Sequence, residues 1–332
     1  MTRAGLARGA ALAAAGIAFP FVVHAAWIVN IGVLTLMYAA LATAWNLFSG
    51  YTGYISLGQA AFFGVGAYTL GIAFEHFGVG SGYNPFYALP LVGAGVALAS
   101  LPVAWIALRT RHMTFAIVTL TLLFVVQQLA FNLRSVTHGS SGLMLPTPRF
   151  GVANYDRPFY LAMLGLLLLA LGLCWLVLRS KLGLMLLAVR EDEEKARGLG
   201  IRVTGAKLIA WWLSVTITAM VGAVWAYYLT FIYPESSVDP LVMIGAVLMT
   251  FLGGRGTLWG PAIGAFVLVP AQQYMLIHLG GSQLYLVGYA AVFMVVLLLL
   301  PRGILPSLRD VLARTRERQR TRASISRKQA AA

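Results

Sequence analysis

The chain has 332 residues, of which 60% are hydrophobic and only 10% are charged, and its formal net charge is +14. Soluble globular proteins carry about 45–50% apolar and about 25% charged residues, so this composition excludes an ordinary soluble protein and predicts a membrane protein. The one cysteine, Cys174, lies inside an apolar run, which excludes a disulfide framework and a cysteine-based metal cluster.

Ten apolar runs are of roughly the length that crosses a bilayer, which takes about 20 residues of helix. Backbone groups in lipid must hydrogen bond to one another, so these runs predict an all-α polytopic membrane protein with about ten transmembrane helices. Because the eighth run is short and the second hairpin is tight, nine or eleven helices also fit. In chain order the predicted spans are 10–29, 31–48, 57–75, 87–108, 113–131, 159–178, 206–231, 240–252, 258–279 and 284–300.

The basic residues predict the orientation of these spans. With a cytoplasmic N-terminus and alternating spans, all but three of the 24 Lys and Arg fall on the cytoplasmic side; the exceptions are Arg134, Arg149 and Arg157. This positive-inside bias accounts for the net charge without nucleic acid as a partner. It predicts a transmembrane domain over residues 1–305 and a basic cytoplasmic tail, 306–332, that faces lipid headgroups.

The first span has a second interpretation. Arg3 and Arg8 precede an apolar stretch that ends in Val23-His24-Ala25, an order that is also typical of a cleaved signal peptide. The stretch continues into the second span with hardly a break, which favours a retained helix. A cleaved leader would leave nine spans and an unchanged interior.

The second span leads into a glycine-rich stretch, NLFSGYTGYISLGQAAFFGVGAYT, at residues 46–69. Broken helices present N–H groups that suit a carboxylate and C=O groups that suit an ammonium, so this stretch is a candidate lining for an amino-acid pathway. Close packing of helices on glycine explains the same residues equally well. On the first interpretation the pathway residues are Asn46, Gly50, Gly53, Ser56, Gly58, Gln59 and Gly64.

A loop of about 27 residues, 132–158, is predicted on the outer side and contains the sequence THGSSGL at 137–143. This loop is too long to be a simple turn. It would cap the pathway or meet an extracytoplasmic partner, and a surface loop without a role is nearly as good an interpretation.

The loop between the sixth and seventh spans, 179–205, contains the densest charge of the chain. Residues 190–202 read REDEEKARGLGIR, with four acidic residues in succession. Opposite charges four residues apart predict a short helix, which Gly198 and Gly200 would end. These pairs are Arg190–Glu194, Glu191–Lys195 and Glu193–Arg197.

Val189, Ala196 and Leu199 recur at helical spacing in this loop and predict one apolar stripe. The positive-inside bias gains little from four acidic residues, so a merely solvated loop explains the segment less well. We therefore expect a docking surface for a cytoplasmic partner.

A second glycine-rich interruption, FLGGRGTLWGPAIG, occupies residues 251–264 in the other half of the chain. Paired interruptions in two halves are typical of a central pathway, which adds Gly253, Gly254 and Gly260 to the candidate residues. No Gly-Lys-Ser/Thr follows, so this is not a phosphate-binding loop, and Arg255 is predicted to be an anchor on the inner side.

No constellation for catalysis or metal binding occurs in the sequence. The five histidines are scattered, and paired catalytic carboxylates and a nucleophile elbow are absent. The chain is therefore predicted to be no enzyme and to bind no metal. No Asp or Glu lies near the centre of a predicted span, which argues against a proton-driven carrier.

Three ordered segments resemble the LivM-type permeases of the branched-chain amino acid ABC transporter family: NLFSGYTGYISLGQAAFFGVGAYT (46–69), AVREDEEKARGLGIRVTGAKLIAW (188–211) and FLGGRGTLWGPAIGA (251–265). VTHGSSGL (136–143) is a weaker match. The resemblance spans roughly residues 30–305.

The resemblance implies an importer in a bacterial inner membrane, built with a LivH-like second permease, two cytoplasmic ATPase subunits and a periplasmic binding protein. ATP would be used by the ATPase subunits, so this chain would bind no cofactor. The resemblance also implies that residues 191–200 form the coupling helix. The residues predicted to couple to the ATPase are Arg190, Glu191, Asp192, Glu193, Glu194, Ala196, Gly198 and Gly200.

Two positions depart from the family pattern. Gln59 stands where the family often has His, and His138 stands where Gly is usual. Because of these departures the sequence does not single out one substrate. Branched-chain or related hydrophobic amino acids are the expected substrates, and urea, short amides or aromatic acids are the alternatives. An ion-coupled secondary transporter is the alternative from another class.

Overall fold

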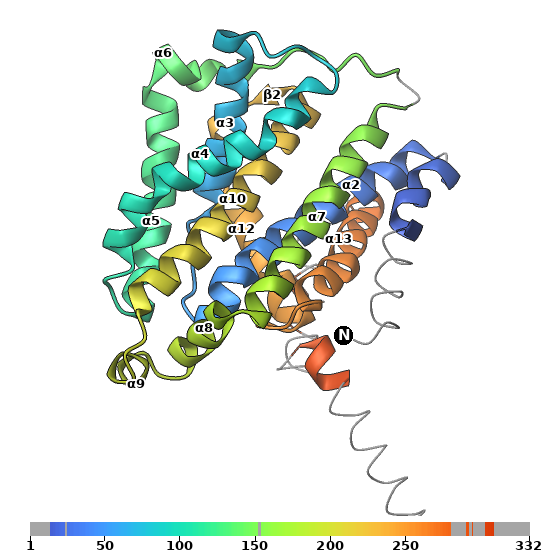
Figure 1. Cartoon of the computed structure of the whole chain (residues 1–332). Helices are drawn as coiled ribbons and strands as arrows, with labels where there is room; N and C mark the ends of the chain where they lie inside the picture. The colour runs from blue at the N-terminus through green and yellow to red at the C-terminus, as the bar shows by residue number, and fades with distance from the viewer. Residues whose placement is uncertain are drawn as a thin grey trace, which may run out of the picture.

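The chain folds into a bundle of long helices that run between two ends, as Figure 1 shows. The computed structural model describes residues 14–23, 25–151, 154–279, 290–291, 294 and 303–308. Residues 14–22 are helical. The elements that follow are α2 (Ala26–Trp45), η1 (Asn46–Gly50), α3 (Gln59–Phe77), α4 (Asn84–Ala107), α5 (His112–Asn132), α6 (Arg134–Thr137), η2 (Gly139–Ser141), β1 (Leu143–Met144), α7 (Asp156–Arg179), α8 (Lys181–Glu191), α9 (Glu193–Gly198), α10 (Val203–Leu229), β2 (Phe231–Ile232), α11 (Pro234–Ser237), α12 (Pro240–Gly253) and α13 (Gly260–Leu279).

Seven helical stretches among the described residues are long and apolar enough to cross a membrane. They are Ala26–Gly50, Asn84–Ala107, His112–Asn132, Asp156–Arg179, Val203–Leu229, Pro234–Gly253 and Gly260–His278. The prediction of a polytopic α-helical membrane protein is confirmed. The predicted count of ten spans is not reached: α3 is a helix of 19 residues but is not among the seven, and the tenth predicted span, 284–300, lies almost wholly outside the described residues.

The predicted boundary between the first two spans is wrong. We expected the chain to turn near residue 30, but the first helix ends at residue 22 and α2 begins at Ala26. Asn30 lies within α2, where its side-chain amide donates a hydrogen bond to the hydroxyl of Tyr228 (2.5 Å). Because this hydrogen bond satisfies the polar group of Asn30 inside the bundle, the chain can continue as a helix through this residue.

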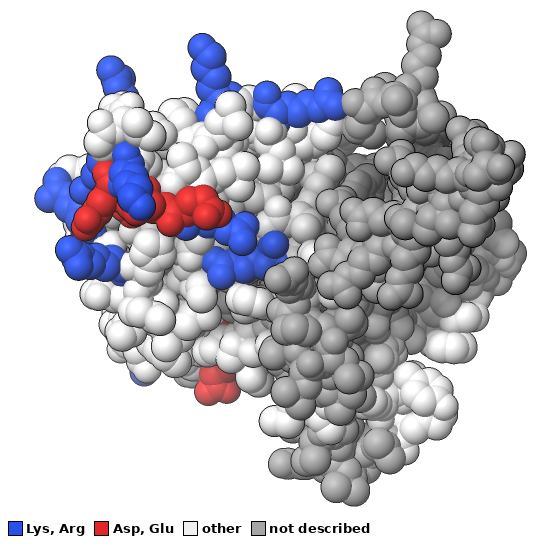
Figure 2. All heavy atoms as spheres, turned by 90° about the horizontal axis from the view of Figure 1, so that it is seen from below, with Lys and Arg blue, Asp and Glu red and all other residues white. Residues whose placement is uncertain are grey.

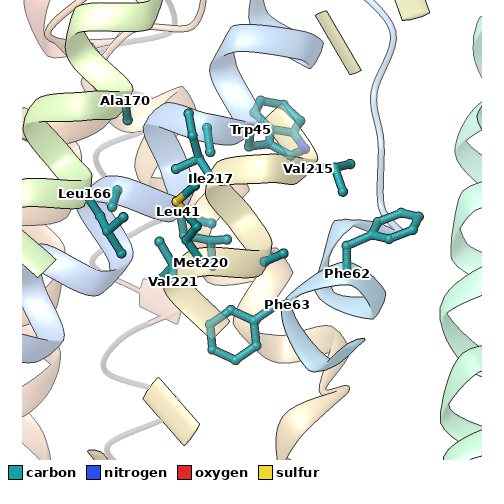
Figure 3. Close-up of a cluster of buried hydrophobic side chains, with 14 of the residues drawn as sticks. Leu41, Trp45, Phe62, Phe63, Leu166, Ala170, Val215, Ile217, Met220 and Val221 are labelled. Atoms are coloured by element: carbon teal, nitrogen blue, oxygen red, sulfur yellow. The ribbon is translucent and has the colours of Figure 1, made fainter. Parts of the chain in front are cut away.

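The helix α10 lies at the centre of the bundle and packs mainly against α3, α4 and α2. Figure 3 shows part of the core, to which α2 contributes Leu41 and Trp45, α3 contributes Phe63, and α10 contributes Ile217 and Val221. Glycines allow α3 and α10 to approach closely, because a β-carbon on Gly222 would lie 2.0 Å from the carbonyl oxygen of Phe63. Backbone contact of this kind is typical of helix packing in membranes.

Loops that were predicted to share a side of the membrane meet at the same end of the bundle. We call the end with α8 and α9 the basic end; the turn at 108–111 and both glycine-rich interruptions contact these helices or their neighbours there. At the opposite end, β1 pairs antiparallel with β2, Leu143 with Ile232 and Met144 with Phe231. This two-residue ladder is the one departure from all-α structure among the described residues.

Candidate translocation and coupling site

The first glycine-rich stretch interrupts a helix at the basic end. The helix α2 continues into the π-helix η1, and residues 53–58 then run without helix to the start of α3. Gly53 has φ of +82°, a conformation that favours glycine. The stretch therefore joins α2 and α3 through six residues without helix, and we call residues 46–58 the first break.

Side chains within the bundle satisfy the polar backbone of the first break. The indole N–H of Trp45 donates to the carbonyl of Ser56 (2.7 Å), and the N–H of Ser56 donates to the hydroxyl of Ser49 (3.2 Å). The N–H of Leu57 donates to the hydroxyl of Thr119 (3.1 Å). Unpaired backbone groups at membrane depth cost several kcal/mol each. These bonds therefore allow irregular backbone that is buried in protein.

The second glycine-rich stretch forms a break between α12 and α13, and it contacts the first. We call residues 254–259 the second break. Asn46 is fully buried and joins the two: its amide donates to the carbonyl of Thr257 (2.9 Å), and its side-chain oxygen accepts from the N–H of Gly256 (2.8 Å). Two segments about 210 residues apart in sequence are thus held together by one side chain.

Two arginines donate hydrogen bonds to carbonyl groups of the first break. Arg255, from the second break, donates to the carbonyls of Ser49 (2.9 Å) and Gly53 (2.8 Å). Arg190, from the last turn of α8, donates to the carbonyl of Gly50 (3.1 Å). The end of a helix carries partial negative charge on its unpaired carbonyls, so guanidinium groups stabilise it. Arg255 lies at the basic end and binds backbone there, and its predicted place on the inner side of the membrane stays a prediction.

The glycines predicted to line a pathway are also sites of close packing. A β-carbon on Gly253 would lie 1.6 Å from the carbonyl oxygen of Gly260, and one on Gly58 would lie 2.2 Å from that of Thr119. A substituted residue would therefore separate the elements. A β-carbon would come closer than 3.0 Å to another atom at the predicted pathway residues Gly50, Gly58, Gly64, Gly253, Gly254 and Gly260; at Gly53 its nearest neighbour would be the Arg190 side chain at 3.2 Å. Their role in a pathway stays a prediction.

Among the residues predicted to line the pathway, two have a buried side-chain oxygen that lacks a hydrogen-bond partner within the described part of the chain. These oxygens are Ser56 Oγ in the first break and Gln59 Oε1 at the start of α3. The amide nitrogen of Gln59 is engaged, because it donates to the hydroxyl of Ser214 (2.6 Å). A buried polar group without a partner costs about 1–3 kcal/mol, so both oxygens favour a site where water or a polar solute is bound.

The charged loop forms two helices rather than the single helix that we predicted. Asp192 adopts an extended conformation between α8 and α9, and its carboxylate accepts a hydrogen bond from the N–H of Lys195 (3.0 Å), which makes it the N-cap of α9. The pairs Arg190–Glu194 and Glu191–Lys195 would need one continuous helix and do not form, whereas Glu193–Arg197 does (2.6 Å). We call residues 181–200 the α8–α9 elbow.

The predicted apolar stripe of the elbow is correct for two of its three members. Val189 and Ala196 are buried in a small cluster with Val203. Leu199 is 81% exposed, because the chain turns away after α9 through Gly200, which has φ of +80°. Leu199 therefore lies on the outer face of the elbow rather than against the bundle.

Glu193 is the centre of a polar cluster that connects the elbow to the bundle. Its carboxylate accepts hydrogen bonds from the hydroxyl of Tyr54, from the ammonium of Lys207 (3.1 Å to each oxygen) and from Arg197 (2.6 Å). Burial raises the pKa of Glu193, but the hydrogen bonds from Tyr54 and Lys207 outweigh it, and the pKa lies below its ordinary value. We call Tyr54, Glu193, Arg197 and Lys207 the Glu193 cluster.

The outer face of the elbow is exposed and carries charge of both signs. Figure 2 views the molecule from the end with α8 and α9 and shows acidic side chains gathered there beside basic ones. Glu191 and Glu194 are exposed, and Glu194 faces Arg111 from the neighbouring turn (3.9 Å). A hollow of about 310 Å³ lies between that turn and α9, lined by Tyr54, Arg109, Thr110, Arg111, His112, Asp192, Glu193, Glu194 and Arg197.

The loop predicted on the outer side lies at the opposite end and folds over α3. His138 has φ of +59°, and its ring nitrogen Nε2 lies 3.3 Å from a carboxylate oxygen of Glu75. A hollow of about 470 Å³ there has a largely apolar wall, with Phe74, Leu143, Met144 and Phe231 among its lining residues. The loop is therefore structured, and its role stays a prediction.

Sequence patterns did not identify Tyr54 and Lys207 as site residues. Lys207 is one of many basic residues on the predicted inner side, and its side chain is fully buried in the first turns of α10. Its neighbours in the sequence are apolar, so no pattern of residue spacing marks the Lys207 side chain as part of a polar cluster. A lysine inside a predicted span, where charge is costly, was the available hint.

Comparisons with known proteins place the sequence of this chain in one family. Residues 27–302 match the family described as "Branched-chain amino acid transport system / permease component". The chain is 30% identical over 329 residues to the high-affinity branched-chain amino acid transport system permease protein LivM of Salmonella typhimurium, and equally to that of Escherichia coli; each match covers 91% of this chain and 75% of the relative.

A shorter match covers about a third of each chain. It is 30% identical over 107 residues to the autoinducer 2 import system permease protein LsrC of Photorhabdus laumondii, covering 31% of this chain and 32% of the relative. No solved structure matches the chain. The long matches and the apolar helices agree: this chain is an integral membrane protein that belongs to the permease components of branched-chain amino acid transport systems.

Proposed function

We propose that this chain is a transmembrane subunit of an ATP-driven importer for branched-chain or related hydrophobic amino acids, in a bacterial inner membrane with both termini in the cytoplasm. The observation that carries the proposal is the family match over residues 27–302, because it includes both breaks and the elbow. The two LivM relatives share 30% identity across nearly the whole chain and support the same substrate class.

The energy for transport would come from partner subunits. The glycine-rich stretch at 253–256 lacks the Lys-Ser/Thr that a phosphate-binding loop requires, so ATP would bind elsewhere. We infer two cytoplasmic ATPase subunits, a LivH-like second permease and a periplasmic binding protein. The elbow offers the ATPase a compact surface, with exposed charge at Glu191 and Glu194 and an exposed apolar side chain at Leu199.

The substrate would pass beside the two breaks. Interrupted helices present backbone dipoles, which suit the ammonium and carboxylate of an amino acid. The unpaired oxygens of Ser56 and Gln59 lie in this region and support a polar path through an otherwise apolar bundle. ATP binding and hydrolysis would act on this path only if the ATPase states bind the permease states with different affinity.

An ion-coupled secondary transporter is the competing function. Such carriers use Asp, Glu or His within the membrane as proton or ion sites. In the long helices that the structure describes, acidic residues stand near helix ends, as Asp156 does in α7 and Glu75 in α3. This distribution favours a drive from outside the membrane.

Co-purification and uptake test the proposed function. With the rest of its importer co-expressed, the wild-type chain should carry two ATPase subunits and a second permease through purification. Uptake of leucine into proteoliposomes should then require ATP and the binding protein and should persist when an uncoupler is added. Uptake without any ATPase that collapses with the uncoupler would overturn the proposal in favour of the carrier.

Charge reversal tests the docking role of the elbow. Glu191→Lys with Glu194→Lys should abolish leucine uptake and weaken ATPase co-purification, because both side chains are exposed and neither belongs to the Glu193 cluster. Glu235→Lys, an exposed acid at the opposite end, is the control and should leave assembly unchanged. Normal uptake by the double variant contradicts the docking role.

Competition defines the substrate class. Unlabelled leucine, isoleucine and valine should inhibit uptake of labelled leucine, whereas urea and benzoate should not. Inhibition by urea or benzoate at a similar concentration would assign the permease to small amides or aromatic acids instead.

A further inference from the structure

The α8–α9 elbow contacts the first break directly, at two points. The first point is the hydroxyl of Tyr54, which donates to the carboxylate of Glu193 at the start of α9. The second is the carbonyl of Gly50, which accepts from Arg190 at the end of α8 (3.1 Å). These contacts lie on either side of Asp192, the residue at which the elbow bends.

The Tyr54 contact is fixed by its surroundings. Lys207 has a fully buried side chain, and its ammonium binds both oxygens of Glu193 while it lies 4.2 Å from the centre of the Tyr54 ring. The Tyr54 ring also stacks on His112 (4.0 Å between ring centres). A buried charge is retained only with a full set of partners, so Glu193 has one favourable position and carries Tyr54 with it.

The Arg190 contact fits the glycines of both breaks. A β-carbon on Gly53 would lie 3.2 Å from the Arg190 side chain, and one on Gly256 would lie 2.3 Å from its guanidinium. The Arg190 side chain therefore lies between the first break and the second, in space that only glycine leaves open. Arg255 and Asn46 then link the two breaks to each other.

The elbow thus has two faces with different partners. Glu191, Glu194 and Leu199 are exposed and have no bond to the first break. Arg190, although its residue is also exposed, and the half-buried Glu193 are both hydrogen bonded to the first break. A partner that binds the outer face would displace Arg190 and Glu193 with the elbow, since each lies next to an outward-facing residue in the sequence. Because each is bonded to the first break, the displacement reaches the break directly.

We propose that four positioning residues transmit movement of the elbow to the first break: Arg190, Tyr54, Glu193 and Lys207. This inference rests on the proposed function and deepens it, because it names the residues through which an ATPase would act on the pathway. None of these residues needs to touch the substrate. The movement would change the position of residues 50–54, where the helix ends and the non-helical part of the first break begins.

The test uses the complete importer, with both permeases, the ATPase subunits and the binding protein, reconstituted in proteoliposomes. Tyr54→Phe removes one hydroxyl and keeps the ring that stacks on His112 and lies beside Lys207. Arg190→Gln removes the other contact. Tyr155→Phe is the matched control, because the Tyr155 hydroxyl donates a similar hydrogen bond, to the carbonyl of Tyr228 (2.7 Å), at the opposite end.

The readout is the number of leucine molecules imported per ATP hydrolysed. We expect this ratio to fall about tenfold in Tyr54→Phe, because a hydrogen bond to a charged group is worth about that factor. Arg190→Gln should lower it similarly and the double variant should lower it further, while ATPase subunits still co-purify and hydrolyse ATP. Tyr155→Phe should leave the ratio unchanged.

Two results overturn the inference. One is an assembled Tyr54→Phe importer that keeps the wild-type ratio. The other is failure of Tyr54→Phe to assemble, which would give the contact a purely structural role. Failure of the proposed function looks different, because the wild-type chain would then import leucine without ATPase subunits or not import it at all.

Discussion

Two acid–base pairs of similar length lie at opposite ends of the bundle, and they differ in their surroundings. At the basic end, Glu193 and Lys207 are 3.1 Å apart, with side chains 14% and 0% exposed. At the opposite end, Glu75 and His138 are 3.3 Å apart, with side chains 42% and 45% exposed. Distance alone would rank them as equal. Burial makes the first a fixed part of the fold and leaves the second screened by solvent.

The difference follows from the elements that carry the pairs. Lys207 stands on α10, the most enclosed of the long helices, and Glu193 begins a helix that packs against it. His138 stands in a loop, in a left-handed conformation that costs a non-glycine residue energy. The elbow is thus held to α10 by a buried pair at the end where the proposed ATPase would bind. At the opposite end, where the proposed binding protein would deliver substrate, the outer loop is held to α3 by a half-exposed pair.

The largest expected effect separates the two pairs directly. Lys207→Met should lower the free energy of unfolding by about 3 kcal/mol, the lower end of the usual range for breaking a buried pair, because Arg197 still neutralises Glu193. Glu75→Gln should change it by less than about 1 kcal/mol, as expected for a half-exposed pair. Denaturant unfolding in detergent micelles measures both. Equal losses would contradict the comparison.

A second substitution tests rigidity at the basic end through Asn46. Asn46→Ala should cost about 1–3 kcal/mol, because it leaves the carbonyl of Thr257 and the N–H of Gly256, both at half-buried residues, without this partner. Asn132→Ala is the control near the opposite end: the Asn132 amide donates to the carbonyl of Gln128 (2.8 Å) at an exposed position, so its loss should cost under about 0.5 kcal/mol. Similar losses in the same unfolding assay would show that the two breaks are not held together by Asn46.

A third substitution tests the core that joins the two ends. Gly222→Ala should cost about 1–3 kcal/mol, because its β-carbon would lie 2.0 Å from the carbonyl oxygen of Phe63 and would force α3 away from α10. Gly205→Ala, on the same helix with open space around it, should be neutral or stabilising. The difference in melting temperature between the two variants measures this contact. No difference would contradict the close approach.

The sequence predicts helices better than it predicts their contacts. The bounds of α4, α5, α7 and α10 agree with the predicted spans within three residues, because long apolar runs between basic or polar flanks are strong signals. The bend at Asp192 had a signal that the charge pairs obscured: an Asp followed by two Glu residues is typical of a helix start. Asn46 and Gly256 are 210 residues apart, so no local pattern could predict their contact.

The smallest expected effect is at the opposite end, where His138→Gly should be nearly neutral. Glycine relieves the left-handed conformation, a gain of about 1 kcal/mol, and loses a half-exposed pair worth up to about the same. Gly is also usual at this position in the permeases that the sequence resembles. Unfolding within about 1 kcal/mol of wild type, together with unchanged leucine uptake, would mark this pair as dispensable. A loss as large as that of Lys207→Met would show instead that the outer loop is held as firmly as the elbow, and the contrast between the two ends would fail.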